Sequence, residues 1–249
     1  MSARASSDPW VQTFGLLALV SGALTAYARV TPPPAALAAG RTGRKIVDAR
    51  LARDADTSDL AAAAAAAAPG DTLYVRSGVY RGPIKLRGGM RLVGLGPPDS
   101  VVLEGDGTSP LIDVTAGAVS ISSVSLRGGA PAIYAHAGAR LSLAAVTITG
   151  ADVGVVIMGE GSSGEFERLR VVRSARDGVF VRDGASVTLS RSELVGQIAC
   201  GLLVSSASAF LRGSTLRLND YGICSDSASK VDAGDSDLKG NLRGPTAKK

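Results

Sequence analysis

The sequence predicts an all-β protein, a right-handed parallel β-helix: a solenoid of about eight coils with an N-terminal alanine-rich capping helix. Two observations carry this prediction. Short alternating apolar runs recur every 21 to 24 residues, which is typical of stacked repeats. The chain also holds 31 glycines but only 4% aromatic residues. A stacked core needs small and branched aliphatic side chains rather than large rings.

The N-terminal segment, residues 1–28, contains a long apolar stretch from Trp10 to Ala28, preceded by Arg4. Its ending, Ala26-Tyr27-Ala28, has the small residues of a signal-peptide cleavage site. A stretch of about 19 residues is also long enough to stay in the membrane as a single anchor. Signal peptide and membrane anchor both remain open, and a buried helix is the weaker alternative. Either of the first two predicts an exported protein, periplasmic or extracellular.

Residues 29–54 are expected to form a linker. Its most distinctive part runs from Thr31 to about Gly43 and includes Pro32-Pro33-Pro34. Three consecutive prolines cannot continue a helix and favour a stiff, extended spacer. The β-helix domain is accordingly predicted for residues 55–249.

A short helix is predicted at the start of this domain, in the alanine run from Ala61 to Ala68. Ser58 is placed to cap its first N–H groups, and alanine has the highest helix propensity. Pro69-Gly70 ends the helix, and the stretch from Thr72 to Val75 then alternates polar and apolar residues as a strand does. A helix covered mainly with methyl groups is suited to close the open end of a solenoid.

The repeat is clearest after residue 130. Five segments start with a small residue followed by aliphatic ones: Ala132-Ile133-Tyr134-Ala135, Gly154-Val155-Val156-Ile157, Gly178-Val179-Phe180-Val181, Gly201-Leu202-Leu203-Val204 and Gly222-Ile223-Cys224-Ser225. A period in the low twenties fits a leucine-rich repeat or a β-helix. The inward positions mix Val, Ile, Leu and Ala, and no helical segment recurs, so the β-helix is favoured. Stacking in register then aligns equivalent residues at about 4.8 Å per step.

Several stretches resemble one known group of β-helix proteins. They are Pro69-Gly70-Asp71-Thr72-Leu73-Tyr74-Val75, Gly78-Val79-Tyr80, Leu92-Val93-Gly94-Leu95-Gly96, Val101-Val102-Leu103-Glu104-Gly105 and Asn219-Asp220-Tyr221-Gly222-Ile223. The first four resemble the opening of bacterial right-handed β-helix proteins of the pectate-lyase-like superfamily, and the last is similar to the Asn-x-x-Gly-Ile rung of that group. The resemblance covers most of residues 55–244. It implies the fold and leaves the activity open, because the superfamily includes lyases, hydrolases, esterases, epimerases and non-catalytic surface proteins.

The catalytic signatures of that superfamily are absent from the sequence. The chain lacks the paired aspartates with Gly-His-Gly of polygalacturonases and the Arg-x-Pro-x-x-Arg of pectate lyases. It also lacks the Gly-x-x-Asp-Phe-Ile-Phe-Gly of pectin esterases and the Asp-Pro-His of mannuronan epimerases. No insertion interrupts the repeat after residue 110, so no long loop is expected to build a water-excluding cleft. These absences disfavour a catalytic role.

Isolated candidates for chemistry are few. His136 is the only histidine and is expected to project outward, as a general base or as an ordinary solvated side chain. Asp232, Asp235 and Asp237 form a local carboxylate cluster. Solvated turns explain this cluster better than a calcium site, because no Gly-Gly-x-Gly-x-Asp repeat is present. No metal and no cofactor are expected.

The two cysteines, Cys200 and Cys224, are predicted to be unpaired thiols. By strand alternation Cys200 faces inward and Cys224 faces outward. Stacked in neighbouring coils they are about three positions apart, which is beyond the reach of a disulfide.

One outward row is typical of a binding surface. It reads Tyr134, Val156, Phe180, Leu203 and Cys224, and beside it run His136, Met158, Arg182, Ser205 and Asp226. An exposed apolar row is typical of a contact with a glycan or a protein; cover by a C-terminal tail is the equal alternative. The candidate ligand-binding residues are Tyr134, His136, Phe180, Arg182 and Leu203. A further set of basic residues forms either a positive flank beside this row or merely scattered solvated charge: Lys85, Arg87, Arg168, Arg170, Arg173, Arg176, Arg182 and Arg191.

These features favour an extracytoplasmic protein that presents a flat sheet face to a glycan or a protein, without a catalytic site of its own. The alternative is a diverged polysaccharide-modifying enzyme, a lyase, hydrolase or epimerase, in which His136 or an Arg/Asp pair abstracts a proton. A purely structural spacer is the third hypothesis. The net charge of +5 favours anionic partners such as acidic polysaccharide; another envelope protein, or the membrane through an uncleaved segment 10–28, are the other partners considered. No basic run with interleaved aromatics supports nucleic acid.

Overall fold

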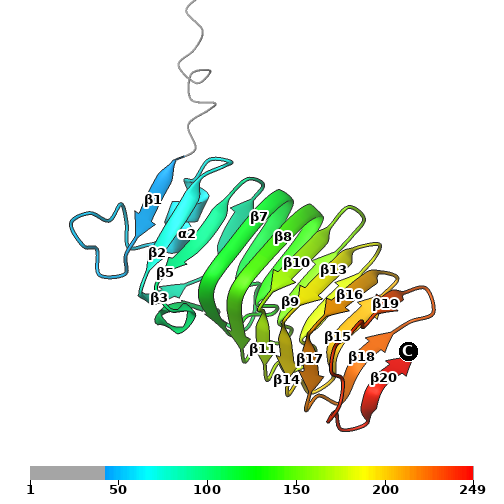
Figure 1. Ribbon diagram of the computed structural model, residues 1–249. Coiled ribbons are helices and arrows are strands. Elements are labelled where there is room, and N and C mark those ends of the chain that lie inside the picture. The colour runs from blue at the N-terminus through cyan, green and yellow to red at the C-terminus, as the bar shows by residue number, and fades with distance from the viewer. Residues whose placement is uncertain (1–42, 249) are drawn as a thin grey trace, which may run out of the picture. The chain divides into compact units, whose positions relative to one another are not determined.

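The computed structural model describes residues 43–248, which wind into a right-handed parallel β-helix of about eight coils (Figure 1). The predicted fold class is therefore confirmed. Each complete coil contributes one strand segment to each of three parallel faces, and we call such a segment a rung.

The three faces run along the coil and are numbered here. Face 1 contains β4 (Ile84–Arg87), the first parts of β7 (Ile112–Arg127) and β8 (Ile133–Thr149), β9 (Val155–Met158), β12 (Val179–Arg182), β15 (Cys200–Ser205), β18 (Tyr221–Ser225) and β20 (Gly244–Lys248). Face 2 contains β1 (Arg44–Val47), β2 (Thr72–Arg76), β5 (Arg91–Leu95), the middle of β7 and β8, β10 (Ser163–Glu167), β13 (Ser186–Ser190), β16 (Ser208–Arg212) and β19 (Lys230–Asp232). Face 3 contains β3 (Gly78–Arg81), β6 (Val101–Glu104), the ends of β7 and β8, β11 (Arg170–Val172), β14 (Glu193–Val195) and β17 (Thr215–Arg217). A 3₁₀ turn, η2 (Pro98–Ser100), joins β5 to β6.

Single residues in the left-handed conformation turn the chain at its corners. Between face 2 and face 3 these residues are Ser123, Ala145, Arg168 and Arg191, with φ values of 56°, 53°, 51° and 46°. They occupy equivalent positions, because the residues before them pair in register from coil to coil. The conformation costs about 1–2 kcal/mol for a residue with a Cβ atom, so the paired strands on either side must stabilise it. At each of these corners, a single residue turns the chain from one face to the next without a longer loop.

The interior consists of stacked aliphatic side chains. One inward row of face 1 is Leu86, Val114, Ala135, Ile157, Val181 and Val204, and none of these is more than 1% exposed. Each layer buries the apolar surface of the next, and this burial is the main stabilising contribution to such a fold.

Buried polar side chains join the C-terminal coils to one another. The side chain of Asn219, which is fully buried, accepts a hydrogen bond from the Gln197 N–H (2.9 Å) and donates to the Leu194 carbonyl (3.0 Å) and to Asn241 Oδ1 (3.0 Å). A second row consists of Ser192, Ser214 and Ser236. The Ser192 hydroxyl accepts the Leu169 N–H, the Ser214 hydroxyl accepts the Ser192 N–H, and the Ser236 hydroxyl accepts the Ser214 N–H. These rows satisfy corner backbone groups that burial would otherwise leave unpaired.

The predicted helix is present as α2 (Leu60–Ala65), which is shorter than the alanine run. Its N-cap is Asp59 rather than Ser58, and the Asp59 carboxylate accepts the N–H of Ala62 at 3.0 Å. The helix buries Leu60 in the core and contacts β4, the first strand of face 1. Its role as a cover for the end of the solenoid stays a prediction.

The first strand begins earlier than the expected domain boundary. β1 lies within residues 29–54, the range expected to be linker, and pairs in parallel with β2. The apolar stretch from Trp10 to Ala28 and the prolines lie outside the described residues. Within residues 43–248, no helix has the length and apolar character needed to span a membrane.

The two cysteines form a disulfide bond, so the prediction of unpaired thiols is wrong. The Cα atoms of Cys200 and Cys224 are 6.0 Å apart, within the usual range for a disulfide. The expected register is present, since Cys224 pairs with Leu203. The assumption of regular alternation fails, because residues 222, 223 and 224 are all buried in succession and the pairing skips residues 201 and 222. Position in the strand therefore did not predict which way each thiol faces.

Candidate functional site

Face 1 brings together the residues predicted to bind a ligand. The parallel register places Tyr134, Val156, Phe180 and Leu203 in one outward row. His136 and Arg182 are the next outward residues on β8 and β12. The structure thus assembles the predicted row, while its role in binding stays a prediction.

This row is less exposed than expected. Val156 is only 9% exposed and Cys224 is fully buried, while the side chains of Tyr134, Phe180 and Leu203 are half-buried. Polar side chains of the neighbouring row lie against the rings: the Arg182 guanidinium is 5.5 Å from the centre of the Phe180 ring. The expectation of an exposed apolar row is therefore wrong, and face 1 presents a mixed aromatic and polar surface.

His136 is held by two neighbours. Its Nε2 atom lies 3.0 Å from Asp113 Oδ1, and its ring stacks on that of Tyr134 with centroids 4.7 Å apart and an interplanar angle of 27°. The side chains of His136 and Asp113 are 27% and 29% exposed. An imidazole fixed at one nitrogen by a carboxylate can exchange a proton through the other. His136 is therefore accessible to solvent and held in one orientation, as a general base must be.

Sequence reasoning missed Asp113. It pairs directly with Tyr134 across β7 and β8, but the clearest repeats of the sequence begin only at Ala132. Asp113 follows Ile112 as Tyr134 follows Ile133, so extending the alignment by one coil toward the N-terminus identifies it.

Positive charges lie on both sides of β8 along the coil. Arg182 is two rungs toward the C-terminus, and its Nε donates to Asp183 Oδ2 at 2.8 Å. Lys85 pairs with Asp113 and is therefore two rungs toward the N-terminus. At about 4.8 Å per rung, each cation-bearing strand is about 10 Å from β8.

Most of the other basic residues considered as a positive flank bind partners in the protein. Three of them donate to an acidic side chain one coil away: Arg170 to Glu193 (3.2 Å), Arg176 to Asp152 (2.7 Å) and Arg191 to Glu167 (2.8 Å). Arg87 donates to the carbonyls of Ala65 and Ala67 at the end of α2. The flank therefore carries much less unpaired charge than the sequence indicates.

The three carboxylates Asp232, Asp235 and Asp237 do not converge on one point. Asp232 accepts from the Gly234 N–H and from Arg212, Asp235 accepts from the Gly213 N–H, and Asp237 from the Lys239 N–H. Across residues 43–248, no group of three His, Cys, Asp or Glu side chains is arranged to hold a metal ion.

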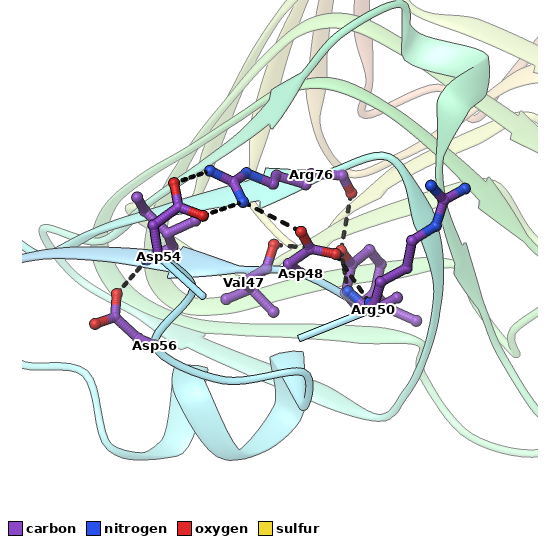
Figure 2. Close-up of polar contacts among 9 residues, drawn as sticks. Val47, Asp48, Arg50, Asp54, Asp56 and Arg76 are labelled. Atoms are coloured by element: carbon purple, nitrogen blue, oxygen red, sulfur yellow. Dashed lines mark hydrogen bonds and ion pairs between the residues drawn. The ribbon is translucent and has the colours of Figure 1, made fainter. Parts of the chain in front are cut away.

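A second polar cluster lies at the N-terminal end of face 2 (Figure 2). Arg76 donates to both carboxylate oxygens of Asp54 and to Asp48 at 3.2 Å. The bond from Arg76 lowers the pKa of Asp54, and the Arg50 N–H is the largest cause of the lowered pKa of Asp48. These contacts fasten residues 48–57 to β2, so we interpret this cluster as structural.

Comparison with known proteins supports the fold. No protein-family model and no curated protein matches the chain. Among solved structures, the A-module of the Azotobacter vinelandii mannuronan C-5 epimerase AlgE6 matches 73% of this chain at 16% identity, with a TM-score of 0.52. This chain spans 64% of that module. The AlgE4 A-module of the same organism matches 76% of this chain and 91% of its own at 13% identity, with a TM-score of 0.31, too low to support an argument. Identity at this level shows a shared fold alone.

Proposed function

We propose that this protein modifies an acidic polysaccharide by proton abstraction, with His136 as the base. The observation that carries the proposal is the cluster of Asp113, His136 and Tyr134 on face 1, between strands that carry Lys85 and Arg182. That a similar solved structure is a mannuronan C-5 epimerase module supports a polysaccharide-modifying enzyme over a surface without chemistry.

The chemistry follows from the groups present. His136 would take the proton from the ring carbon that bears a uronate carboxylate, and the electron pair would spread onto that carboxylate. Asp113 would orient the ring and stabilise the imidazolium, as a positioning residue. Because the two rings are stacked, His136 and Tyr134 would lie on the same side of the sugar. The Tyr134 hydroxyl would then donate a proton to the departing glycosidic oxygen as the C–O bond breaks, giving an unsaturated sugar. Protonation of the same carbon by water from the opposite side would instead give an epimer.

The spacing of charge suits a linear polyanion lying along the coil. Lys85 and Arg182 are carried about 10 Å to either side of the strand that bears the base. Carboxylates of flanking sugar residues would bind there, fixing the chain over His136 without themselves reacting. A small free uronic acid would gain neither contact and should be a poorer substrate.

The test follows solvent exchange and bond cleavage together. The full chain is incubated in D₂O with polymannuronate, polyguluronate or polygalacturonate, and NMR measures deuterium at the carbon beside the carboxylate and unsaturated ends. His136→Ala should lower the rate by about 10²–10⁴-fold, whereas Ser163→Ala on face 2 should leave it unchanged. Wild-type exchange and cleavage that are both no faster than those of His136→Ala would reject the proposal.

A non-catalytic glycan-binding protein is the second candidate. It is favoured by a concave surface that lies on face 2, lined by residues such as Ser120, Ser142 and Thr188, rather than over His136. This candidate predicts binding of polysaccharide without any exchange or cleavage, and the experiment above separates the two.

We further propose that the protein acts outside the cytoplasm, in the periplasm or beyond it. The apolar N-terminal stretch and the Cys200–Cys224 disulfide support this localisation, since disulfides persist mainly in oxidising compartments. Fractionation of cells expressing the full chain tests it, and recovery with cytosolic markers would contradict it.

A further inference from the structure

A separate surface with unused charge lies at the N-terminal end of face 2. The pairing of β1, β2 and β5 places Arg44, Thr72 and Arg91 in one outward row. Tyr74 is the next outward residue on β2, and the Arg44 guanidinium lies over its ring, 4.9 Å from the centroid. At about 4.8 Å per rung, the two arginine backbones are about 10 Å apart. The row thus carries the Thr72 hydroxyl group in the middle, with one arginine cation on each side of it.

The surface between the two arginines is concave because its remaining lining is glycine. Gly43, Gly70 and Gly89 contribute backbone alone. Gly89 has φ +88°, and a Cβ atom there would lie 2.6 Å from the Gly70 nitrogen. No other residue fits that position without moving the backbone, so this position of the hollow stays free of side chains.

Neither arginine is neutralised by the part of the chain that the structure describes. Within residues 43–248 no carboxylate pairs with Arg44 or Arg91, whereas many arginines of the later coils bind an acid one coil away. The adjacent acid, Asp71, is buried and accepts the N–H groups of Gly43 (2.6 Å) and Ala68 (2.9 Å). Its carboxylate therefore binds backbone N–H groups, and the exposed guanidinium groups of Arg44 and Arg91 stay unpaired.

We propose that this hollow binds an anionic group of an acidic polysaccharide. Guanidinium groups with free N–H donors match carboxylate and sulfate oxygens, the Thr72 hydroxyl adds a donor, and the Tyr74 ring offers an apolar contact for a sugar. A polysaccharide is favoured over a free anion because the row continues on the same face into the hydroxyl groups of Ser120 and Ser142, before it reaches the carboxylate of Glu165. The site is separate from His136 and does not depend on the proposed reaction.

The test is binding of the full chain to polygalacturonate and to dextran sulfate, measured by titration calorimetry at two salt concentrations with uncharged dextran as the blank. Arg44→Gln/Arg91→Gln should weaken binding about tenfold or more and reduce its salt dependence. The control, Arg81→Gln/Arg217→Gln, removes the same charge from exposed positions of face 3 and should change the dissociation constant less than about twofold. His136→Ala should leave the part of the binding that depends on Arg44 and Arg91 intact, which distinguishes failure here from failure of the proposed reaction.

A second variant tests the site without changing charge. Tyr74→Leu keeps both arginines and should weaken binding about threefold through loss of the ring beneath Arg44. Equal weakening by the two arginine pairs would overturn the proposal, since net charge would then be responsible. Binding of neither polyanion by the wild-type protein would also overturn it, as would Arg44- and Arg91-dependent binding confined to inorganic phosphate or to vesicles of anionic phospholipid. Circular dichroism of each variant confirms that it is folded.

Discussion

The C-terminal coils and the N-terminal end of this protein are held by different kinds of contact. Among the later coils, buried amide and serine rows and the Cys200–Cys224 disulfide connect each layer to the next. At the N-terminal end, α2 and the Arg76 cluster take this role. A repeating layer can satisfy its corners with repeated hydrogen bonds, whereas the first layer of the described residues is held by contacts of its own. The following substitutions test that distinction.

The largest effect is expected at the buried amide row. Asn219→Ala leaves the Gln197 N–H and the Leu194 carbonyl without their partner, and two such buried groups cost about 4 kcal/mol together. Urea unfolding measures the loss. Leu218→Ala, at the exposed neighbouring position, should change stability by less than about 0.5 kcal/mol, and equal losses in the two variants would show that the row is not a stabilising element.

Removing the disulfide should come next. The two cysteines are separated by 24 residues, and opening a loop of that size costs about 3 kcal/mol in the chain-entropy model. Cys200→Ser/Cys224→Ser should therefore unfold at lower urea concentration. Adding reductant to the wild-type protein should lower its free energy of unfolding by the same amount, while the stability of the double variant should not change with reductant. A wild-type protein whose stability is also unchanged by reductant would contradict the presence of the disulfide.

At the N-terminal end the expected effect depends on pH. The folded-state pKa values of Asp48 and Asp54 lie below the ordinary value of 3.8. Their contribution to stability is therefore complete above that value and is lost as the pH falls through the lower folded-state values. Arg76→Gln should weaken this acid dependence and speed proteolysis within residues 48–57 at neutral pH. Arg81→Gln is the control, and an unchanged acid profile in Arg76→Gln would mean that Arg76 does not govern these carboxylates.

The smallest effect is expected at the one-residue corners of the regular coils. Ala145→Gly relieves a left-handed conformation, at the cost of a more flexible unfolded chain, and should stabilise the protein by about 0.5 kcal/mol. The adjacent Ala144→Gly relieves nothing and should destabilise it by about 0.5–1 kcal/mol. Thermal melting distinguishes the two, and a loss in both would indicate that the corner is not strained.

The comparison of regions also explains what the sequence predicted. In the regular coils, period and alternation were enough to place Tyr134, Phe180 and Leu203 in one row, because in-register stacking depends on little else. The same reasoning failed for Cys224, where the alternation breaks beside Gly222. A thiol's orientation at an irregular corner depends on backbone angles that spacing does not encode.

The site was predicted in part. His136 and its row were identified, but Asp113 was not, because its coil precedes the clearest repeats. The hollow beside Arg44 was also missed, because identifying it as a binding site requires knowing which arginines pair with acidic side chains of neighbouring coils. Such pairings join residues more than 20 positions apart and become visible only once the register is known.

The one-residue corners also restrict how this protein can grow or shrink in evolution. A single inserted residue within a strand would move every later side chain of that strand to the opposite side of its sheet, so that core side chains would become exposed and exposed ones buried. Inserting or deleting a whole period, 21 to 24 residues here, keeps the phase and changes the length by about 4.8 Å. Viable length variants should therefore differ by complete turns, so that the molecule lengthens in fixed increments.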